Sequence, residues 1–297
     1  MTMTESLALQ ISTAAFSTGS LIAPSLAGRL ALRMFSTPFA ASSLSQRQKF
    51  LVGKAEARLA AMVPVRISHK AGEVQAYFFA AKPDVAPRGT IVLVHGWTSG
   101  ARFMLAFVNS LARRGFNTVA FDLPAHGKST GRVTNMSECA AALQAVGAHF
   151  GPVHGIVAHS FGAAVTALAV EGAAPMPSRL DVAKIALIAS PNAVSFATRS
   201  LGKSIGLGSR AQDDFESQLA AQVGRPIDAL VGTKIYGKIE KPMLVIHCED
   251  DDEVPFSQGR AYQDIASCQF VAVKGLGHRR ILYSWNVVRK VMQFMGE

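Results

Sequence analysis

The chain has 297 residues, of which 49% are hydrophobic and only 17% are charged, and its net charge is +10. This length suits one large α/β domain or two small ones, and the average use of Gly and Pro excludes a collagen-like or disordered chain. The three cysteines are far apart and show no metal-binding spacing, so we expect a reducing compartment, the cytoplasm.

The first 60 residues contain helical patterns but no strand pattern, which predicts a helical extension over residues 1–60. Residues 1–70 hold eight Lys or Arg against Glu5 and Glu56, a net charge of +6. Because the bases are not interleaved with aromatic residues, no nucleic-acid groove is expected. A solvated helix face and a peripheral contact with anionic lipid both stay open.

The beginning of the chain does not have the pattern of a membrane segment. No base precedes the first apolar run, which argues against a signal peptide. Polar residues and two arginines interrupt residues 6–40, so we expect no membrane-spanning helix.

Eight short apolar runs rich in Val and Ile follow from about residue 63, with helical patterns between most of them. This alternation predicts an α/β fold with a mostly parallel central sheet and helices on both faces. The expected strands are 63–69, 74–81, 89–97, 117–124, 153–160, 184–190, 242–250 and 268–275, and the expected helices are 101–115, 135–151 and 161–173.

Residues 193–240 fall outside this alternation and contain helical patterns. They predict a small helical cap, inserted into a main domain of residues 61–297, over the strand ends where open α/β sheets bind ligands. Apolar residues of the cap would either form an acyl pocket, with Phe161 and Trp97 at its mouth, or simply hold the cap on the core. These residues are Val194, Phe196, Leu201, Ile205 and Leu207.

The stretch IVAHSFGAAV, residues 156–165, places Ser160 between a buried strand pattern and a helix of small residues. A tight turn from strand to helix would project this serine at the top of the sheet. Strand and helix approach closely there, which favours small residues two positions away on each side, here Ala158 and Gly162. By itself, the stretch equally fits a serine that caps a helix.

Two later segments supply the partners that a nucleophilic serine needs. The acidic run EDDDEVP follows one apolar strand pattern, and His278 follows the next. Both would therefore reach the same edge of the sheet as Ser160, in the chain order serine, acid, histidine. The backbone N–H groups of Trp97 and Phe161 are the expected donors of an oxyanion hole.

Five segments resemble, in order, the motifs of the α/β-hydrolase family, and within it the chain is most similar to bacterial serine-aminopeptidase-like and monoacylglycerol-lipase-like members. The segments span about residues 63–297 and are HGWTSG (95–100), DLPAHGKSTG (122–131), AHSFG (158–162), IHCEDDDEVP (246–255) and GLGHRRIL (275–282). The resemblance implies Ser160 as nucleophile, Asp251 as acid and His278 as base. Ala158 and Cys248 stand where the family usually has glycine, and neither change removes a reacting group.

The sequence therefore predicts a carboxylesterase-like serine hydrolase that acts on a small-molecule acyl substrate without a cofactor. Neighbouring side chains of one turn, such as His247, Glu249, Asp250 and Asp252, cannot all converge on one ion, so no metal is expected. An acyltransferase or peptidase on the same triad, or a non-catalytic binding protein on this scaffold, are the alternatives.

Overall fold

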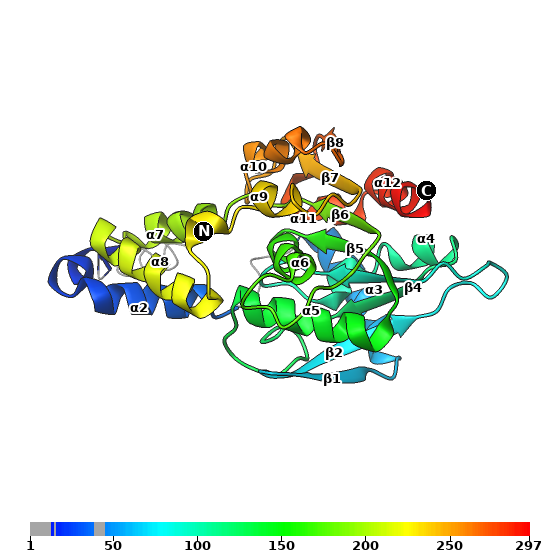
Figure 1. The fold of residues 1–297 in the computed structure, drawn as a ribbon, viewed down its shortest axis with the longest axis horizontal. Helices are drawn as coiled ribbons and strands as arrows, with labels where there is room; N and C mark the ends of the chain where they lie inside the picture. The colour runs from blue at the N-terminus through cyan, green and yellow to red at the C-terminus, as the bar shows by residue number, and fades with distance from the viewer. Residues whose placement is uncertain (1–12, 15, 39–44) are drawn as a thin grey trace.

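The computed structural model describes residues 13–14, 16–38 and 45–297 (Figure 1). Eight strands form one sheet in the order β1-β2-β4-β3-β5-β6-β7-β8. β2 pairs antiparallel with β1 and with β4, and all the other neighbours pair parallel. The strands are β1 Val65–His69, β2 Gly72–Phe79, β3 Thr90–Val94, β4 Asn117–Phe121, β5 Val153–His159, β6 Lys184–Ile188, β7 Met243–Cys248 and β8 Cys268–Val273. The predicted α/β fold with a mostly parallel sheet is confirmed.

Helices cover both faces of the sheet. Alternate residues of a strand point to opposite faces. Val92 and Val94 of β3 pack in a core with α5 and α6, whereas Ile91 and Leu93 pack in a core with α3, α4 and α12. These helices are α3 Gln46–Ala60, α4 Val108–Ala112, α5 Met136–Phe150, α6 Phe161–Glu171 and α12 Trp285–Gly296. Shorter elements are η1 Ala101–Met104, α10 Phe256–Arg260, η3 Ala261–Asp264, α11 Gly277–Arg280 and η4 Ile281–Tyr283.

The helix expected over residues 101–115 divides into η1 and α4. Phe103, Met104, Phe107 and Val108 are all at least 97% buried. All four belong to the core on this face of the sheet, so both pieces pack inward on either side of the break.

The cap consists of α7 Val194–Ile205, α8 Ser209–Val223, η2 Ile227–Ala229 and α9 Gly232–Tyr236. In Figure 1, α7 and α8 lie beside the sheet together with α2, Pro24–Phe35. α2 approaches α8 so closely that a Cβ on Gly28 would lie 2.9 Å from the carbonyl oxygen of Ala211. Ser25 Oγ also donates a hydrogen bond of 2.8 Å to Asp214. α2 is therefore a further helix of the cap.

The described residues among the first 60 divide between the two parts of the molecule. α2 lies on the cap, whereas α3 buries Val52 and Leu59 against the sheet. A boundary at residue 60 would thus separate α3 from the sheet face that it covers. Among the residues described, no helix is long and apolar enough to cross a membrane.

Candidate active site

Ser160 occupies a strained turn between β5 and α6, with φ 51° and ψ −120°. A positive φ is unfavourable for a residue with a Cβ and persists only where the surroundings hold it. The Ser160 N–H donates to the carbonyl of Ile188 in the adjacent strand at 2.9 Å. A Cβ on Gly162 would lie 2.7 Å from the carbonyl oxygen of Val94, so glycine is needed there. Ala158 is fully buried, and its methyl group is accommodated.

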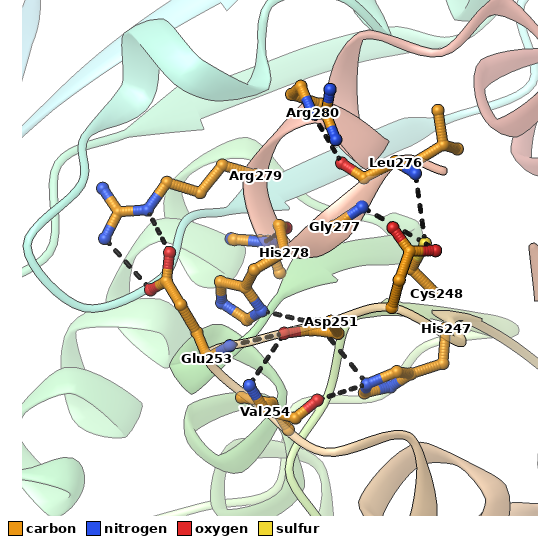
Figure 2. Close-up of polar contacts among 12 residues, drawn as sticks. His247, Cys248, Asp251, Glu253, Val254, Leu276, Gly277, His278, Arg279 and Arg280 are labelled. Atoms are coloured by element: carbon orange, nitrogen blue, oxygen red, sulfur yellow. Dashed lines mark hydrogen bonds and ion pairs between the residues drawn. The ribbon is translucent and has the colours of Figure 1, made fainter. Parts of the chain in front are cut away.

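Asp251 and His278 form a direct pair at the same edge of the sheet (Figure 2), with Asp251 Oδ2 2.8 Å from His278 Nδ1. The other oxygen of Asp251 accepts hydrogen bonds from the N–H groups of Glu253 at 3.0 Å and Val254 at 2.8 Å. Burial raises the pKa of Asp251, but hydrogen bonding and the His278 charge outweigh it and hold this pKa below its usual value. The ionised carboxylate accepts the proton on Nδ1 of the neutral His278 ring, which leaves Nε2 without a proton.

The neighbouring acids of the run do not face His278. Asp250 accepts a hydrogen bond from the N–H of Gly275 at 2.6 Å, and its side chain lies 3.1 Å from Cys248 Sγ. Asp252 is exposed. Of these three acids, Asp251 is therefore the one that lies beside the histidine. Within the described residues, no group of three or more His, Cys, Asp or Glu side chains could hold a metal ion.

His247 supports the turn that carries Asp251. Its Nε2 lies 2.9 Å from the carbonyl oxygen of Val254 and 3.4 Å from Asp251 Oδ2 (Figure 2). Burial lowers the pKa of His247, so the ring is neutral at pH 7. The shorter contact is then the hydrogen bond, and the longer one is not an ion pair.

Cys248 links the acid turn to the loop of the histidine. Its sulfur accepts the N–H groups of Leu276 at 3.3 Å and Gly277 at 3.2 Å, immediately before His278 (Figure 2). The side chain is fully buried. A glycine here would provide none of these contacts.

Trp97 and Phe161 follow the ends of β3 and β5. In the described part of the chain, neither backbone N–H has a hydrogen-bond partner. Their rings pack edge to face at 5.0 Å, and the Trp97 ring also packs on His126 at 4.9 Å. His126 Nε2 accepts the N–H of Thr98 at 3.3 Å, and burial lowers the pKa of both His126 and His95. These two histidines are neutral and shape the turn that presents Trp97.

Two cavities, of about 350 Å³ and about 120 Å³, meet at four shared residues: Trp97, Ser160, Glu253 and His278. Among the described residues, no hydrogen bond joins the Ser160 hydroxyl to the His278 ring. Such bonds are often loose without substrate and shorten when it binds. The serine and the histidine thus border the same two spaces.

The larger cavity is lined mainly by apolar residues of α2, α6 and the cap. Val194 and Phe196 line it, which agrees with the first of the two alternatives for the cap residues. Leu201, Ile205 and Leu207 pack in the core, which agrees with the second. Phe35 and Ser36 at the end of α2 and Met136 at the start of α5 also line it, which was not predicted from the sequence. No local pattern indicates that these distant segments reach Ser160.

The smaller cavity is bordered by an ion pair that was not predicted from the sequence. Arg279 donates to the two oxygens of Glu253 at 2.7 and 3.1 Å. His159 lines the same cavity. Two positions in the sequence could have indicated this pair. Glu253 lies two residues after Asp251, and Arg279 directly follows His278.

A family model described as "Alpha/beta hydrolase family" matches residues 91–288, about two-thirds of the chain. The chain belongs to the α/β-hydrolase family. The resemblance read from the sequence is therefore confirmed at the level of the family. A comparison with curated proteins finds no match by sequence.

Solved structures share the α/β-hydrolase fold at low identity. The ferulic-acid-bound Est1E of Butyrivibrio proteoclasticus is 18% identical with a TM-score of 0.60, and the match covers 78% of this chain and 96% of that one. The esterase EaEST of Exiguobacterium antarcticum is 13% identical with a TM-score of 0.58, covering 79% and 100%. A bacterial membrane phospholipase A is 17% identical with a TM-score of 0.58, covering 83% and 91%. At these identities, the likeness concerns the fold.

Proposed function

We propose that this α/β hydrolase cleaves carboxylic esters that carry an apolar acyl group, through an acyl-enzyme on Ser160. One observation carries the proposal: Ser160, held in a strained turn, borders both cavities with His278, whose Nδ1 lies 2.8 Å from Asp251. A nucleophile, a base and an orienting acid in this order are what acyl transfer needs.

Each residue has a defined role in the proposed reaction. His278 Nε2 takes the hydroxyl proton of Ser160 while Oγ bonds to the ester carbonyl carbon. The N–H groups of Trp97 and Phe161 donate to the resulting oxyanion, and each contributes ~3 kcal/mol. The C–O bond to the alcohol then breaks, and the leaving oxygen takes the proton from His278. Asp251 stays ionised and stabilises the protonated ring.

Water completes the cycle on the acyl-enzyme. His278 removes one proton from water while the water oxygen bonds to the acyl carbon. The second oxyanion uses the same two N–H donors. When the bond from carbon to Ser160 Oγ breaks, His278 returns its proton to the serine, and the carboxylic acid leaves.

The shapes of the cavities support a short or medium acyl chain. The larger cavity follows α6 as far as Ala167, seven residues beyond Ser160, which corresponds to about 10 Å of helix. Each methylene buried there stabilises the bound ester by about 0.8 kcal/mol. We assign the acyl chain to this cavity and the alcohol to the smaller one beside Arg279.

Two measurements test the proposal. A fluorophosphonate probe is expected to label the protein but not Ser160→Ala, with Ser99→Ala as the control that retains labelling. Across p-nitrophenyl esters from acetate to palmitate, kcat/KM is expected to rise with acyl length and then fall. Labelling of Ser160→Ala, activity confined to amides, or a rate still rising at palmitate would contradict the proposal. Added alcohol that diverts most product to a new ester would instead indicate an acyltransferase.

A further inference from the structure

Large apolar side chains are concentrated on the outer side of the N-terminal helices. Leu21 is 87% exposed, Ile22 80%, Leu26 51% and Leu30 48%. They are four of the nine exposed large hydrophobic residues in the described part of the chain, so most of the molecular surface lacks such a patch. Ordinary surfaces expose large apolar residues singly rather than in groups.

Two arginines share this side of the helices. Arg29 and Arg33 are exposed. With Leu26 and Leu30, they recur at spacings of three and four residues, which places these four residues on one side of α2. Leu21 and Ile22 are exposed at the end of the helical segment that precedes α2. We call these six residues the outer stripe.

The opposite side of α2 is fixed on the cap. Ala27, Gly28, Ala31 and Leu32 are buried. The Ser20 hydroxyl, just before α2, accepts the N–H of Gly208 at 3.0 Å. Because this side is packed, the outer stripe cannot turn inward to cover its apolar side chains.

The segment that carries the outer stripe has charge of one sign. Residues 6–55 contain five bases and no Asp or Glu, so the segment offers its arginines no carboxylate partner. If the outer stripes of two copies packed together, the arginines of both copies would meet at one interface with no acid on either stripe. The like charges would repel each other, which disfavours a second copy as the partner. Apolar side chains flanked by arginines are the pattern of a helix that lies on an anionic lipid surface.

We propose that the outer stripe docks on the surface of an anionic lipid bilayer. Its leucines and Ile22 enter the boundary between headgroups and acyl chains, and Arg29 and Arg33 lie at the level of the lipid phosphates. α2 has 12 residues, about 18 Å, and lies in the interface rather than across the bilayer. Phe35 at the end of α2 lines the larger cavity, so docking brings the cavity that holds Ser160 close to the lipid.

Vesicle flotation of the full-length protein tests the docking. Vesicles of phosphatidylcholine with 30% phosphatidylglycerol are expected to carry the protein upward, and vesicles of phosphatidylcholine alone to carry much less. The double variant Ile22→Asp/Leu26→Asp is expected to lower the partition coefficient at least tenfold. Arg29→Gln/Arg33→Gln is expected to lower it about fivefold per arginine at low salt and to remove its salt dependence.

The control variant removes an exposed apolar side chain elsewhere. Trp285 is 58% exposed on α12, at the opposite end of the molecule from α2 (Figure 1). Trp285→Ser is expected to float as the unchanged protein does. Absence of flotation with anionic vesicles, or equal loss in the Trp285 variant, would overturn the docking. So would outer-stripe variants that keep flotation but convert a dimer to a monomer.

These experiments test the membrane docking independently of the proposed ester hydrolysis. No residue of the outer stripe lines either cavity. All the variants are therefore expected to hydrolyse a soluble p-nitrophenyl ester at the unchanged rate.

Discussion

The ring of His159 lies against the backbone of His278, with Nε2 3.0 Å from the His278 carbonyl oxygen. Burial lowers the pKa of His159 to about 3, so the ring is neutral and its Nε2–H donates this hydrogen bond. The residue before the proposed nucleophile thus holds the main chain of the proposed base. The two rings also lie 4.8 Å apart, centroid to centroid.

His159→Leu is expected to lower kcat by about tenfold with little change in KM, because the base loses its backbone anchor and its alignment. The matched control is His154→Leu, on the same strand, whose ring contacts the carbonyl of Met295 instead. Steady-state kinetics on one p-nitrophenyl ester measures both. Equal rates for the two variants would contradict a positioning role for His159.

Asp251→Asn is expected to lower kcat about 10⁴-fold, because an amide cannot hold the His278 ring in the tautomer that the reaction needs. Asp250→Asn and Asp252→Asn provide matched controls from the same turn and should each retain most of the activity. Circular dichroism of all three variants excludes unfolding as the cause. Similar losses at all three positions would refute the assignment of Asp251.

Acid is expected to destabilise the fold through its buried histidines. Burial lowers the pKa of four of them, His95, His126, His159 and His247. As pH falls below about 6.5, these histidines bind protons in the unfolded chain but stay neutral in the folded one, so the free energy of unfolding decreases. Each such histidine contributes a slope of up to about 1.4 kcal/mol per pH unit, which for His159 continues to about pH 3.

Urea unfolding between pH 7 and pH 4.5 measures this slope. His159→Leu removes one of the four groups, so its free energy of unfolding should depend less steeply on pH than that of the unchanged protein. An identical slope in both proteins would mean that His159 is not the buried neutral group described here.

The parts of the site that could be predicted from the sequence are formed by residues that are consecutive in the chain. A buried strand, Ser160 and a small-residue helix are consecutive, so the turn can be recognised without tertiary information. The choice of Asp251 over its neighbours came from the family resemblance, and the structure adds the direction of each side chain. Phe35 could not be placed, because its approach to Ser160 depends on how α2 packs on α8, a contact between segments about 180 residues apart.

Cys248→Ala is expected to lower both stability and activity, because the N–H groups of Leu276 and Gly277 lose their buried acceptor. An unsatisfied buried N–H costs about 1–3 kcal/mol. Cys248→Ser keeps an acceptor and should recover part of the loss, whereas Cys139→Ala changes a buried cysteine outside the site. A thermal melt and one kinetic assay of each variant suffice. If Cys248→Ala behaves like the unchanged protein, the sulfur does not hold the two loops together.

Phe35→Ala is expected to move the preferred acyl length upward, because the ring that it removes lines the larger cavity. Each methylene accommodated in the new space should raise kcat/KM about fourfold, the equivalent of about 0.8 kcal/mol. Phe50→Ala is the matched control, since Phe50 is 61% exposed on α3 and lines neither cavity. Phe35 also packs edge to face on Phe215 at 5.4 Å, so some loss of stability should accompany the change.

Both phenylalanine variants are measured with the p-nitrophenyl ester series. This distinguishes a change in the preferred acyl length from a general loss of activity. A shifted optimum in Phe35→Ala and an unchanged one in Phe50→Ala is the expected pair of results. A uniform fall across all chain lengths in Phe35→Ala would mean that α2 only supports the cap. In that case the acyl chain would not reach the N-terminal helix, and the cavity wall that binds it would belong to α6 and the cap insert.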